Sequence, residues 1–237
     1  MKTQPVLSPA AQQFVDSILA LQPRVAVFDC DGTLWSGDSG ADFFYWEVER
    51  KLLPAGMTKW AVERYADYKR GNVDEALMCG EMVTINEHIP LALLEKEAAE
   101  MFAKVVEPRV FPEMRHLTQE LSRAGCSLWA VSSTNDWVVR EGVKRFGIPA
   151  QNVLAASVEI EKGFATDRLI RVPSGPAKAT ALIEVAKRDV DVCFGNSVHD
   201  LEMLKIARTP VAVNPNRDLE ALAAENAWKI YWPMGTK

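Results

Sequence analysis

One stretch constrains the fold of this chain more than any other: residues Val25 to Thr33, which read Val-Ala-Val-Phe-Asp-Cys-Asp-Gly-Thr. Its continuous apolar start is typical of a central parallel strand that is covered on both faces. Asp29 ends this strand, and Asp31 follows two residues later. Alternate residues of an extended segment point to the same side, so we expect the two carboxylates to lie together at the carboxyl end of a strand, where α/β sheets bind ligands. Such a pair needs a cation, a shared proton or a role in proton transfer.

The composition excludes several classes of protein. A chain of 237 residues that is 48% hydrophobic can form one domain with or without an insert. Its net charge of −5 and the lack of a long Lys/Arg run predict no nucleic-acid partner. Met1 to Pro23 reads as an amphipathic helix rather than a signal peptide, and no apolar run approaches the roughly 20 residues of a membrane span. Four widely spaced cysteines without a C-x-x-C pair argue against zinc or disulfides and favour a cytoplasmic protein.

A block of helices interrupts the strand pattern between Trp35 and Pro108. The predicted helices are Gly40–Leu53, Met57–Lys69, Val73–His88 and Leu91–Val106, separated by Pro and Gly residues. Four consecutive helices inside an α/β chain predict an all-helical insert. We therefore divide the chain into a core, residues 1–35 and 109–237, and an inserted domain, residues 36–108.

The rest of the chain alternates helices with strands, which predicts a doubly wound, mostly parallel Rossmann-like α/β sheet. The predicted helices are Pro9–Leu21, Pro112–Ala124, Trp137–Phe146, Pro176–Lys187, Val198–Ala207 and Arg217–Glu225. The predicted strands, besides Val25–Asp29, are Ser127–Ser132, Asn152–Ala156, Val190–Phe194, Pro210–Val213 and Trp228–Trp232. Glu159–Arg171 reads as a β-hairpin that turns near Lys162 and Gly163.

Three further polar segments should lie at strand ends beside Asp29. Ser132–Asp136 ends a strand and opens a helix, which suits an anion site but equally a helix N-cap. Ser174–Lys178 opens another helix, and Lys178 is either a phosphate ligand or a solvated surface residue. Gly195–Asp200 offers amide, hydroxyl and carboxylate oxygens that suit Mg²⁺, or a cap of the following helix.

In this order the four segments resemble the haloacid dehalogenase (HAD) superfamily over nearly the whole chain. The likeness is strongest to phosphoserine phosphatase-like members, whose helical cap is inserted just after the first motif, where residues 36–108 lie. The resemblance implies a phosphatase in which Asp29 takes the phosphoryl group as an aspartyl-phosphate. Asp31 would protonate the leaving oxygen and then activate water. Dehalogenases of the superfamily lack an acid at this second place, so Asp31 favours phosphoryl transfer.

The resemblance also implies a phosphate site and a metal site. The residues expected to bind or flank the phosphoryl group are Ser132, Lys178, Gly32, Thr33 and Ser133. Mg²⁺ would be held by Asp29, the backbone carbonyl of Asp31 and the side chain of Asn196, with Asp200 nearby. Phosphoserine phosphatases usually carry Asp in place of Asn196, so this chain has one negative charge fewer and should bind the metal more weakly.

The substrate is expected to meet the insert near its start, in an aromatic stretch from Trp35 to Trp60. Asp38 matches the position of a Glu that meets the substrate amine in phosphoserine phosphatases. An acid beside aromatic faces, Trp35 among them, would hold an ammonium group, as in phosphoserine, phosphoethanolamine or phosphocholine. The alternative is that these rings form the core of the insert and that its acids favour a helix N-terminus. Arg64 and Arg70 are candidates to meet a substrate carboxylate.

Two other functions remain open from the sequence. The weakened metal site at Asn196 would suit a non-catalytic sensor of a phosphate ligand with the same fold. A receiver-like phosphoacceptor domain is disfavoured by the length of the chain and by the insert. His199 lies beside the metal turn, but Asp31 already fills the acid–base role, so we expect no catalytic step from it. The sequence does not predict an oligomeric state.

Overall fold

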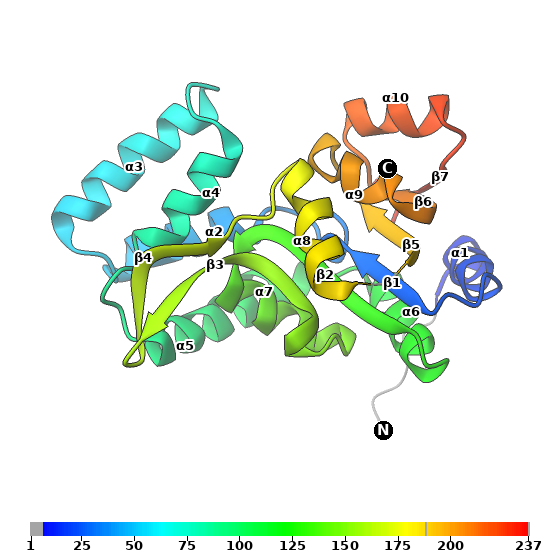
Figure 1. The fold of residues 1–237 in the computed structure, drawn as a ribbon, viewed down its shortest axis with the longest axis horizontal. Coiled ribbons are helices and arrows are strands. Elements are labelled where there is room, and N and C mark those ends of the chain that lie inside the picture. The colour runs from blue at the N-terminus through cyan, green and yellow to red at the C-terminus, as the bar shows by residue number, and fades with distance from the viewer. Residues whose placement is uncertain (1–6, 188, 237) are drawn as a thin grey trace.

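The computed structural model describes residues 7–187 and 189–236, so the first six residues of the amphipathic segment lie outside the described part. Its strands are β1 (Val25–Phe28), β2 (Ser127–Asn135), β3 (Val153–Glu161), β4 (Phe164–Arg171), β5 (Val190–Gly195), β6 (Ala207–Val213) and β7 (Lys229–Tyr231). Within the described residues they form one seven-stranded sheet of order β4-β3-β2-β1-β5-β6-β7 (Figure 1). Neighbouring strands run parallel except for the antiparallel β3–β4 pair. The predicted mostly parallel α/β sheet is confirmed.

Helices cover both faces of the sheet. They are α1 (Pro9–Leu19), α2 (Ser39–Arg50), α3 (Ala55–Lys69), α4 (Glu75–Thr84), α5 (Leu91–Met101), α6 (Pro112–Arg123), α7 (Asp136–Val143), α8 (Pro176–Ala186), α9 (Leu201–Lys205) and α10 (Arg217–Glu225). Core residues of α1, α6 and α7 pack with Ala26 and Phe28 of β1, and those of α8, α9 and α10 pack with Val25 and Val27. Alternate β1 side chains thus enter opposite apolar layers, which explains the continuous apolar sequence of this strand.

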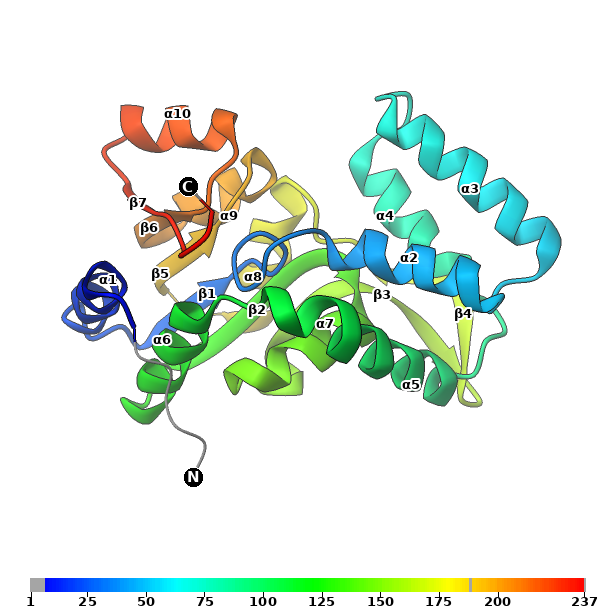
Figure 2. The same ribbon diagram turned by 180° about the vertical axis from the view of Figure 1, so that it is seen from behind.

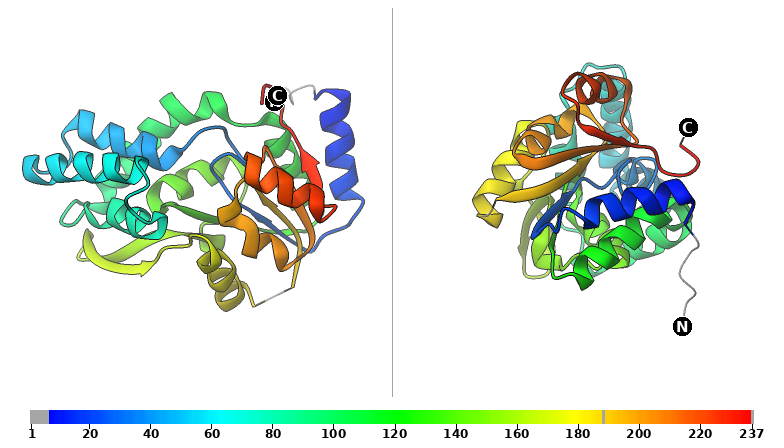
Figure 3. Two further views of the ribbon diagram at one scale, coloured as in Figure 1. Left: turned by 90° about the horizontal axis from the view of Figure 1, so that it is seen from above. Right: turned by 90° about the vertical axis from the view of Figure 1, so that its right-hand side faces the viewer.

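The central position of β1 places Asp29 at the middle of the sheet edge. β1 pairs with β2 on one side and with β5 on the other. The ladder continues one residue further, because the Asp29 N–H donates to the carbonyl oxygen of Phe194 at 2.9 Å. The segments after β1, β2 and β5 therefore meet at one edge, as the strand pattern predicts. At the far edge of the sheet, β7 lies beside α1, where the ring of Tyr231 stacks on Phe14 (Figure 3).

The four predicted helices of the insert are present as α2 to α5. Helix α3 packs on α4 and stands away from the sheet, whereas α4 contacts β2, β3 and β4 (Figure 2). Helix α5 packs along α7 and continues as a π-helical turn, Phe102–Val106, and a 3-10 turn, Glu107–Arg109. The two connections between the insert and the core lie side by side, because Trp35 forms an antiparallel β-bridge with Val110. The division at residues 35/36 and 108/109 stays a prediction.

Some elements extend beyond their predicted ends. The predicted strand Asn152–Ala156 and the first arm of the hairpin are one strand, β3, which leaves β2 after Ala156 and then pairs with β4. The turn at Lys162 and Gly163 is confirmed, with φ of 52° and 85°, as the two-residue hairpin turns require. Strand β2 runs to Asn135 rather than ending at Ser132. In the part of the chain that the structure describes, no helix is both long and apolar enough to span a bilayer.

Candidate active site

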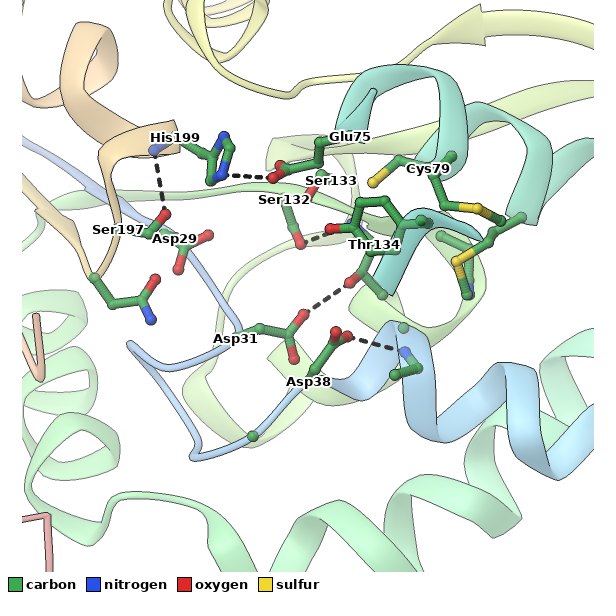
Figure 4. A pocket seen from close by; sticks show the side chains of 18 of the residues that line it. Asp29, Asp31, Asp38, Glu75, Cys79, Ser132, Ser133, Thr134, Ser197 and His199 are labelled. Carbon is green, nitrogen blue, oxygen red and sulfur yellow. Dashed lines mark hydrogen bonds and ion pairs between the residues drawn. The ribbon is translucent and has the colours of Figure 1, made fainter. Parts of the chain in front are cut away.

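A cavity of about 240 Å³ separates the carboxyl ends of β1, β2 and β5 from helices α2, α3 and α4 (Figure 4). Its core side includes Asp29, Asp31, Ser132, Ser133, Thr134, Lys178, Asn196 and Ser197. Its cap side includes Asp38, Tyr65, Tyr68, Glu75, Met78, Cys79 and Met82. Four segments that are distant in the sequence thus meet around one space, as their strand-end positions predict.

Asp29 is buried and held by donors on both carboxylate oxygens. Its Oδ1 accepts a hydrogen bond from Nζ of Lys178 at 2.7 Å, and its Oδ2 accepts one from Oγ1 of Thr33 at 2.8 Å. Lys178 lies in the first turn of α8 and also donates to Oδ1 of Asp200 at 2.6 Å. Burial and then the charge of Asp200 raise the pKa of Asp29 to about 7, although Lys178 acts to lower it. Lys178 is 3% exposed, which excludes the solvated surface position and agrees with the inward position that the family resemblance implied.

Asp200 fixes the turn that follows β5 and does not itself line the cavity. Its Oδ2 accepts hydrogen bonds from the backbone N–H groups of Asn196 at 2.9 Å and Ser197 at 3.0 Å. A Cβ at Gly195 would lie 2.6 Å from Cβ of Asp200, so only glycine allows this turn to close. Asp200 therefore holds Lys178 and the Asn196 loop, where the sequence prediction placed it beside the metal.

Asp31 faces the same cavity as Asp29, which agrees with the alternation expected for the pair. Its Oδ1 accepts hydrogen bonds from Nε1 of Trp35 at 2.7 Å and the N–H of Ser39 at 2.6 Å. Its Oδ2 accepts one from Oγ1 of Thr134 at 2.7 Å. Trp35 is fully buried and does not line the cavity, so the prediction that it contacts the substrate is wrong. Its indole packs into the core and orients Asp31 instead.

The residues predicted around the phosphate divide into two groups. Ser132 and Ser133 line the cavity, and Oγ of Ser132 accepts a hydrogen bond from the N–H of Thr134 at 3.2 Å. Gly32 and Thr33 are buried behind Asp29 and do not line the cavity, contrary to prediction. Thr33 orients Asp29. A Cβ at Gly32, where φ is +77°, would lie 1.9 Å from the Asn196 side chain, so this glycine lets the two loops touch.

The oxygen donors at this edge suit a Mg²⁺ ion. Asp29, Asp31 and Asn196 all line the cavity, and the contact at Gly32 brings the loop of the two aspartates against that of Asn196. Mg²⁺ typically takes one or two carboxylates and keeps several waters. Within the described residues there is no cluster of three His, Cys, Asp or Glu side chains suited to a metal. The set of Mg²⁺ ligands expected from the resemblance does not need such a cluster, because it combines one carboxylate with a backbone carbonyl and an amide oxygen.

The aromatic lining of the cap comes from residues that the sequence did not single out. Phe43 and Phe44, in the predicted stretch, are 1% exposed and form the core of the insert, as the alternative interpretation holds. The rings that line the cavity are Tyr65 and Tyr68 of α3. Their three-residue spacing places them on one helix face, which was the available signal. Asp38 fits both interpretations: its Oδ1 caps α2 by accepting the N–H of Ala41 at 2.9 Å, and it lines the cavity.

Glu75 is a second cap acid that the sequence analysis missed. It is the first residue of α4, and its Oε2 lies 2.6 Å from Nε2 of His199. Its Oε1 accepts a hydrogen bond from Oγ of Ser174 at 2.7 Å. The hydrogen bond to Glu75 raises the pKa of His199. These contacts join the cap to the loops that carry Lys178 and Asn196, a link between distant segments that spacing alone does not reveal.

Known proteins resemble this chain in sequence and in fold. A family model described as haloacid dehalogenase-like hydrolase matches residues 26–205. Histidinol-phosphatase of Neisseria meningitidis is 30% identical over 87% of this chain and 97% of that protein. Phosphoserine phosphatase SerB1 of Mycobacterium tuberculosis is 27% identical over 86% of this chain and 69% of that protein. A solved structure from Bordetella pertussis, of unknown function, has a TM-score of 0.77 at 21% identity over 88% of this chain and 97% of that chain.

The D-x-D-G-T segment lies inside the matched region, and both of its carboxylates face the cavity. The match spans most of the chain, and the Neisseria relative aligns over nearly its whole length. The chain therefore belongs to the haloacid dehalogenase-like hydrolase family, and it is a phosphoric monoester hydrolase of that family.

Proposed function

We propose that the enzyme is a Mg²⁺-dependent phosphatase that hydrolyses a small amine-bearing phosphomonoester through an aspartyl-phosphate on Asp29. The observation that carries this proposal is the position of Asp29 at the edge of the cavity, with its carboxylate fixed by Lys178 and Thr33. A carboxylate held in one orientation is ready for in-line attack on a phosphorus atom. Asp31, from the same loop, is held by three donors and faces the same space.

The reaction would proceed in two steps on these residues. A carboxylate oxygen of Asp29 forms a bond to phosphorus while the bond to the ester oxygen breaks, and Asp31 gives its proton to the departing alcohol. Asp31 then takes a proton from water, whose oxygen attacks phosphorus and releases inorganic phosphate from Asp29. Ser132 and Lys178 would bind the phosphoryl oxygens and stabilise the charge that they carry in the transition state.

Mg²⁺ would be held by Asp29, the backbone carbonyl of Asp31 and Asn196. When bound, it would offset the repulsion between the phosphate and the carboxylates. Asn196 supplies an amide oxygen where an aspartate would supply a charge, so we expect weaker metal binding than an aspartate would give. Free cysteines at four separate positions are consistent with our proposal of a cytoplasmic enzyme. We also propose that residues 36–108 act as the cap over this site.

The amine is the feature of the substrate that the cap supports best. Asp38 lines the cavity beside Tyr65 and Tyr68, and a carboxylate with aromatic faces attracts an ammonium group. Histidinol phosphate, which the name of the Neisseria relative indicates for that protein, carries such an amine and is our first candidate. Phosphoserine, phosphoethanolamine and phosphocholine complete the set to be tested.

Hydrolysis of an aryl phosphate, with and without Mg²⁺, tests the proposed reaction. Wild-type protein should release phosphate only with the metal, and Asp29→Asn should release none. Turnover by Asp29→Asn would refute the nucleophile assignment. A wild-type protein that binds phosphate esters without hydrolysing them would favour the non-catalytic sensor, for which Asn196 is the supporting feature. If the wild-type protein is active, it should hydrolyse histidinol phosphate in preference to an alkyl phosphate without an amine. Equal use of the two esters would refute the amine site.

A further inference from the structure

The cap side of the cavity carries acids and no cation of its own. Asp38 and Glu75 both line it, whereas Lys178 is the one Lys or Arg among the described lining residues. Lys178 belongs to the opposite, phosphate end, where Asp29 and Asp200 hold its ammonium group at 2.7 and 2.6 Å. A leaving group that enters the cap therefore meets the negative charge of Asp38, the ion pair of Glu75 with His199, and no Lys or Arg side chain among the described lining residues other than Lys178.

All three arginines of residues 36–108 are engaged elsewhere, and Arg50 pairs with Glu100 of α5. Arg64 binds Glu81 through Nε at 2.7 Å and Nη2 at 2.8 Å, and neither residue lines the cavity. Arg70 pairs with Asp67 at 2.6 Å and is largely exposed at the end of α3. Both were candidates to receive a substrate carboxylate, and the structure places both outside the cavity.

His199 is the remaining group that could receive an anion. Its Nε2 is already bound to Oε2 of Glu75 at 2.6 Å. A substrate carboxylate that bound His199 would have to break this ion pair and would leave Glu75 without its partner. One ion pair would replace another, so the number of ion pairs would not increase. The carboxylate would also face Asp38 across the cavity.

The remaining cap surface is apolar and polarisable. Tyr65 and Tyr68 present aromatic rings, and Met78 and Met82 present thioethers. Aromatic faces attract cations, and Met side chains pack against irregular apolar groups or rings. The two tyrosine hydroxyls can each donate a hydrogen bond, but this wall offers a carboxylate no positive charge in place of the water that it loses on entry.

From these observations we infer that the enzyme selects phosphate esters of amino alcohols and rejects those of amino acids. The leaving group is cationic and lacks a carboxylate, because an unpaired anion would be desolvated and would be repelled by Asp38, while the cation of His199 is already bound to Glu75. This inference deepens the proposed function and rests on it. It narrows the candidate substrates by removing phosphoserine.

Phosphoethanolamine and phosphoserine form a matched pair, because they differ only by the carboxylate. We expect kcat/KM for phosphoethanolamine to exceed that for phosphoserine by roughly tenfold or more. Where turnover is slow, the inhibition constants of the two esters against aryl phosphate hydrolysis should show the same order. Equal or better use of phosphoserine would overturn the inference, and so would a failure of both esters to bind. Aryl phosphate turnover separates these outcomes from a failure of the proposed phosphatase activity.

A cation added to the cap wall should weaken the preference for phosphoethanolamine over phosphoserine. Met82→Arg places a guanidinium group at the cavity, so we expect the ratio of kcat/KM for phosphoethanolamine to that for phosphoserine to fall by roughly tenfold. Leu77→Arg is the matched control, because Leu77 lies on the same helix, is 50% exposed and does not line the cavity. Its ratio should equal that of the wild type. An unchanged ratio in folded Met82→Arg would contradict the inference.

Discussion

At the core end of the cavity, the carboxylates of Asp29 and Asp31 have hydrogen-bond donors on all four oxygens, at 2.6 to 2.8 Å. At the cap end, the one side-chain hydrogen bond described for Asp38 comes from the backbone of its own helix, and rings and thioethers make up most of the rest. The difference indicates that the reacting groups are fixed before a substrate arrives. Under our proposal, the cap end selects the leaving group.

Loss of the acid at the core end should have the largest effect. In Asp31→Asn, the amide can still accept hydrogen bonds from Trp35 and Ser39, but it cannot exchange the proton that the reaction needs. We expect kcat for an alkyl phosphate to fall by about 10²- to 10⁴-fold. Steady-state kinetics check this, with Asp67→Asn on α3 as the control outside the cavity. A kcat within a few-fold of wild type would show that another group carries the proton.

Removal of the buried cation, Lys178, should have the next largest effect. Lys178→Met leaves Asp29 and Asp200 buried without their shared partner, so the free energy of unfolding should fall by about 3–5 kcal/mol. Urea denaturation without added metal measures it. Lys205→Met, which removes a surface pair with Glu202, should cost less than about 1 kcal/mol. Similar values for the two variants would mean that the network at the core end is not a rigid frame.

A change at the cap end should alter selection rather than stability. Asp38→Asn keeps an oxygen for the N–H of Ala41, so α2 stays capped while the charge is lost. We expect kcat/KM for an amine-bearing ester, relative to aryl phosphate, to fall about tenfold, which corresponds to about 1.4 kcal/mol. Asp74→Asn, the same substitution at the N-cap of α4 outside the cavity, should leave this ratio unchanged. Equal ratios in all three proteins would remove Asp38 from substrate binding.

The smallest effect is expected where the chain returns from the cap to the core. Partial burial acts to raise the pKa of Glu107. Hydrogen bonds from Arg145 and Arg115 outweigh this effect and hold the pKa below its usual value. A lowered folded-state pKa stabilises the protein above the unfolded-state value and loses this effect as the pH falls. Glu107→Gln should therefore lower the free energy of unfolding by about 0.5–1 kcal/mol at pH 7. Thermal melts should show the difference shrinking below about pH 4.5. A difference that is constant with pH would exclude the ion pairs as its cause.

The sequence predicted the core end well because its residues follow from strand order. Asp29 and Asn196 directly follow β1 and β5, Ser132 lies near the end of β2, and Lys178 lies in the first turn of α8; all four line the cavity. For Asp29, Ser132 and Asn196, this meeting requires only that the parallel strands β1, β2 and β5 end at one edge. Gly32 failed as a predicted phosphate neighbour, because its contact with the Asn196 side chain depends on loop geometry that spacing does not encode.

The cap end was harder to predict because helix packing decides which face meets the cavity. Trp35 and Phe43 belong to the aromatic stretch that was expected to meet the substrate, but both rings are buried in the hydrophobic core. Tyr65 and Tyr68 reach the cavity only because α3 packs on α4. Glu75 acquires its partner His199 from a segment more than a hundred residues away. Continuity of β3 beyond Ala156 was missed for a similar reason, since the strand changes partners there.

The central claim is that Asp29 carries the phosphoryl group, and trapping the intermediate tests it most directly. Protein mixed with substrate and Mg²⁺ is quenched in acid, reduced with borohydride and digested for mass spectrometry. An aspartyl-phosphate is reduced to homoserine, so the peptide that spans Val25 to Thr33 should carry homoserine at position 29, in amounts that depend on substrate. Homoserine at position 31 or 200, or active protein with position 29 never modified, would contradict the account.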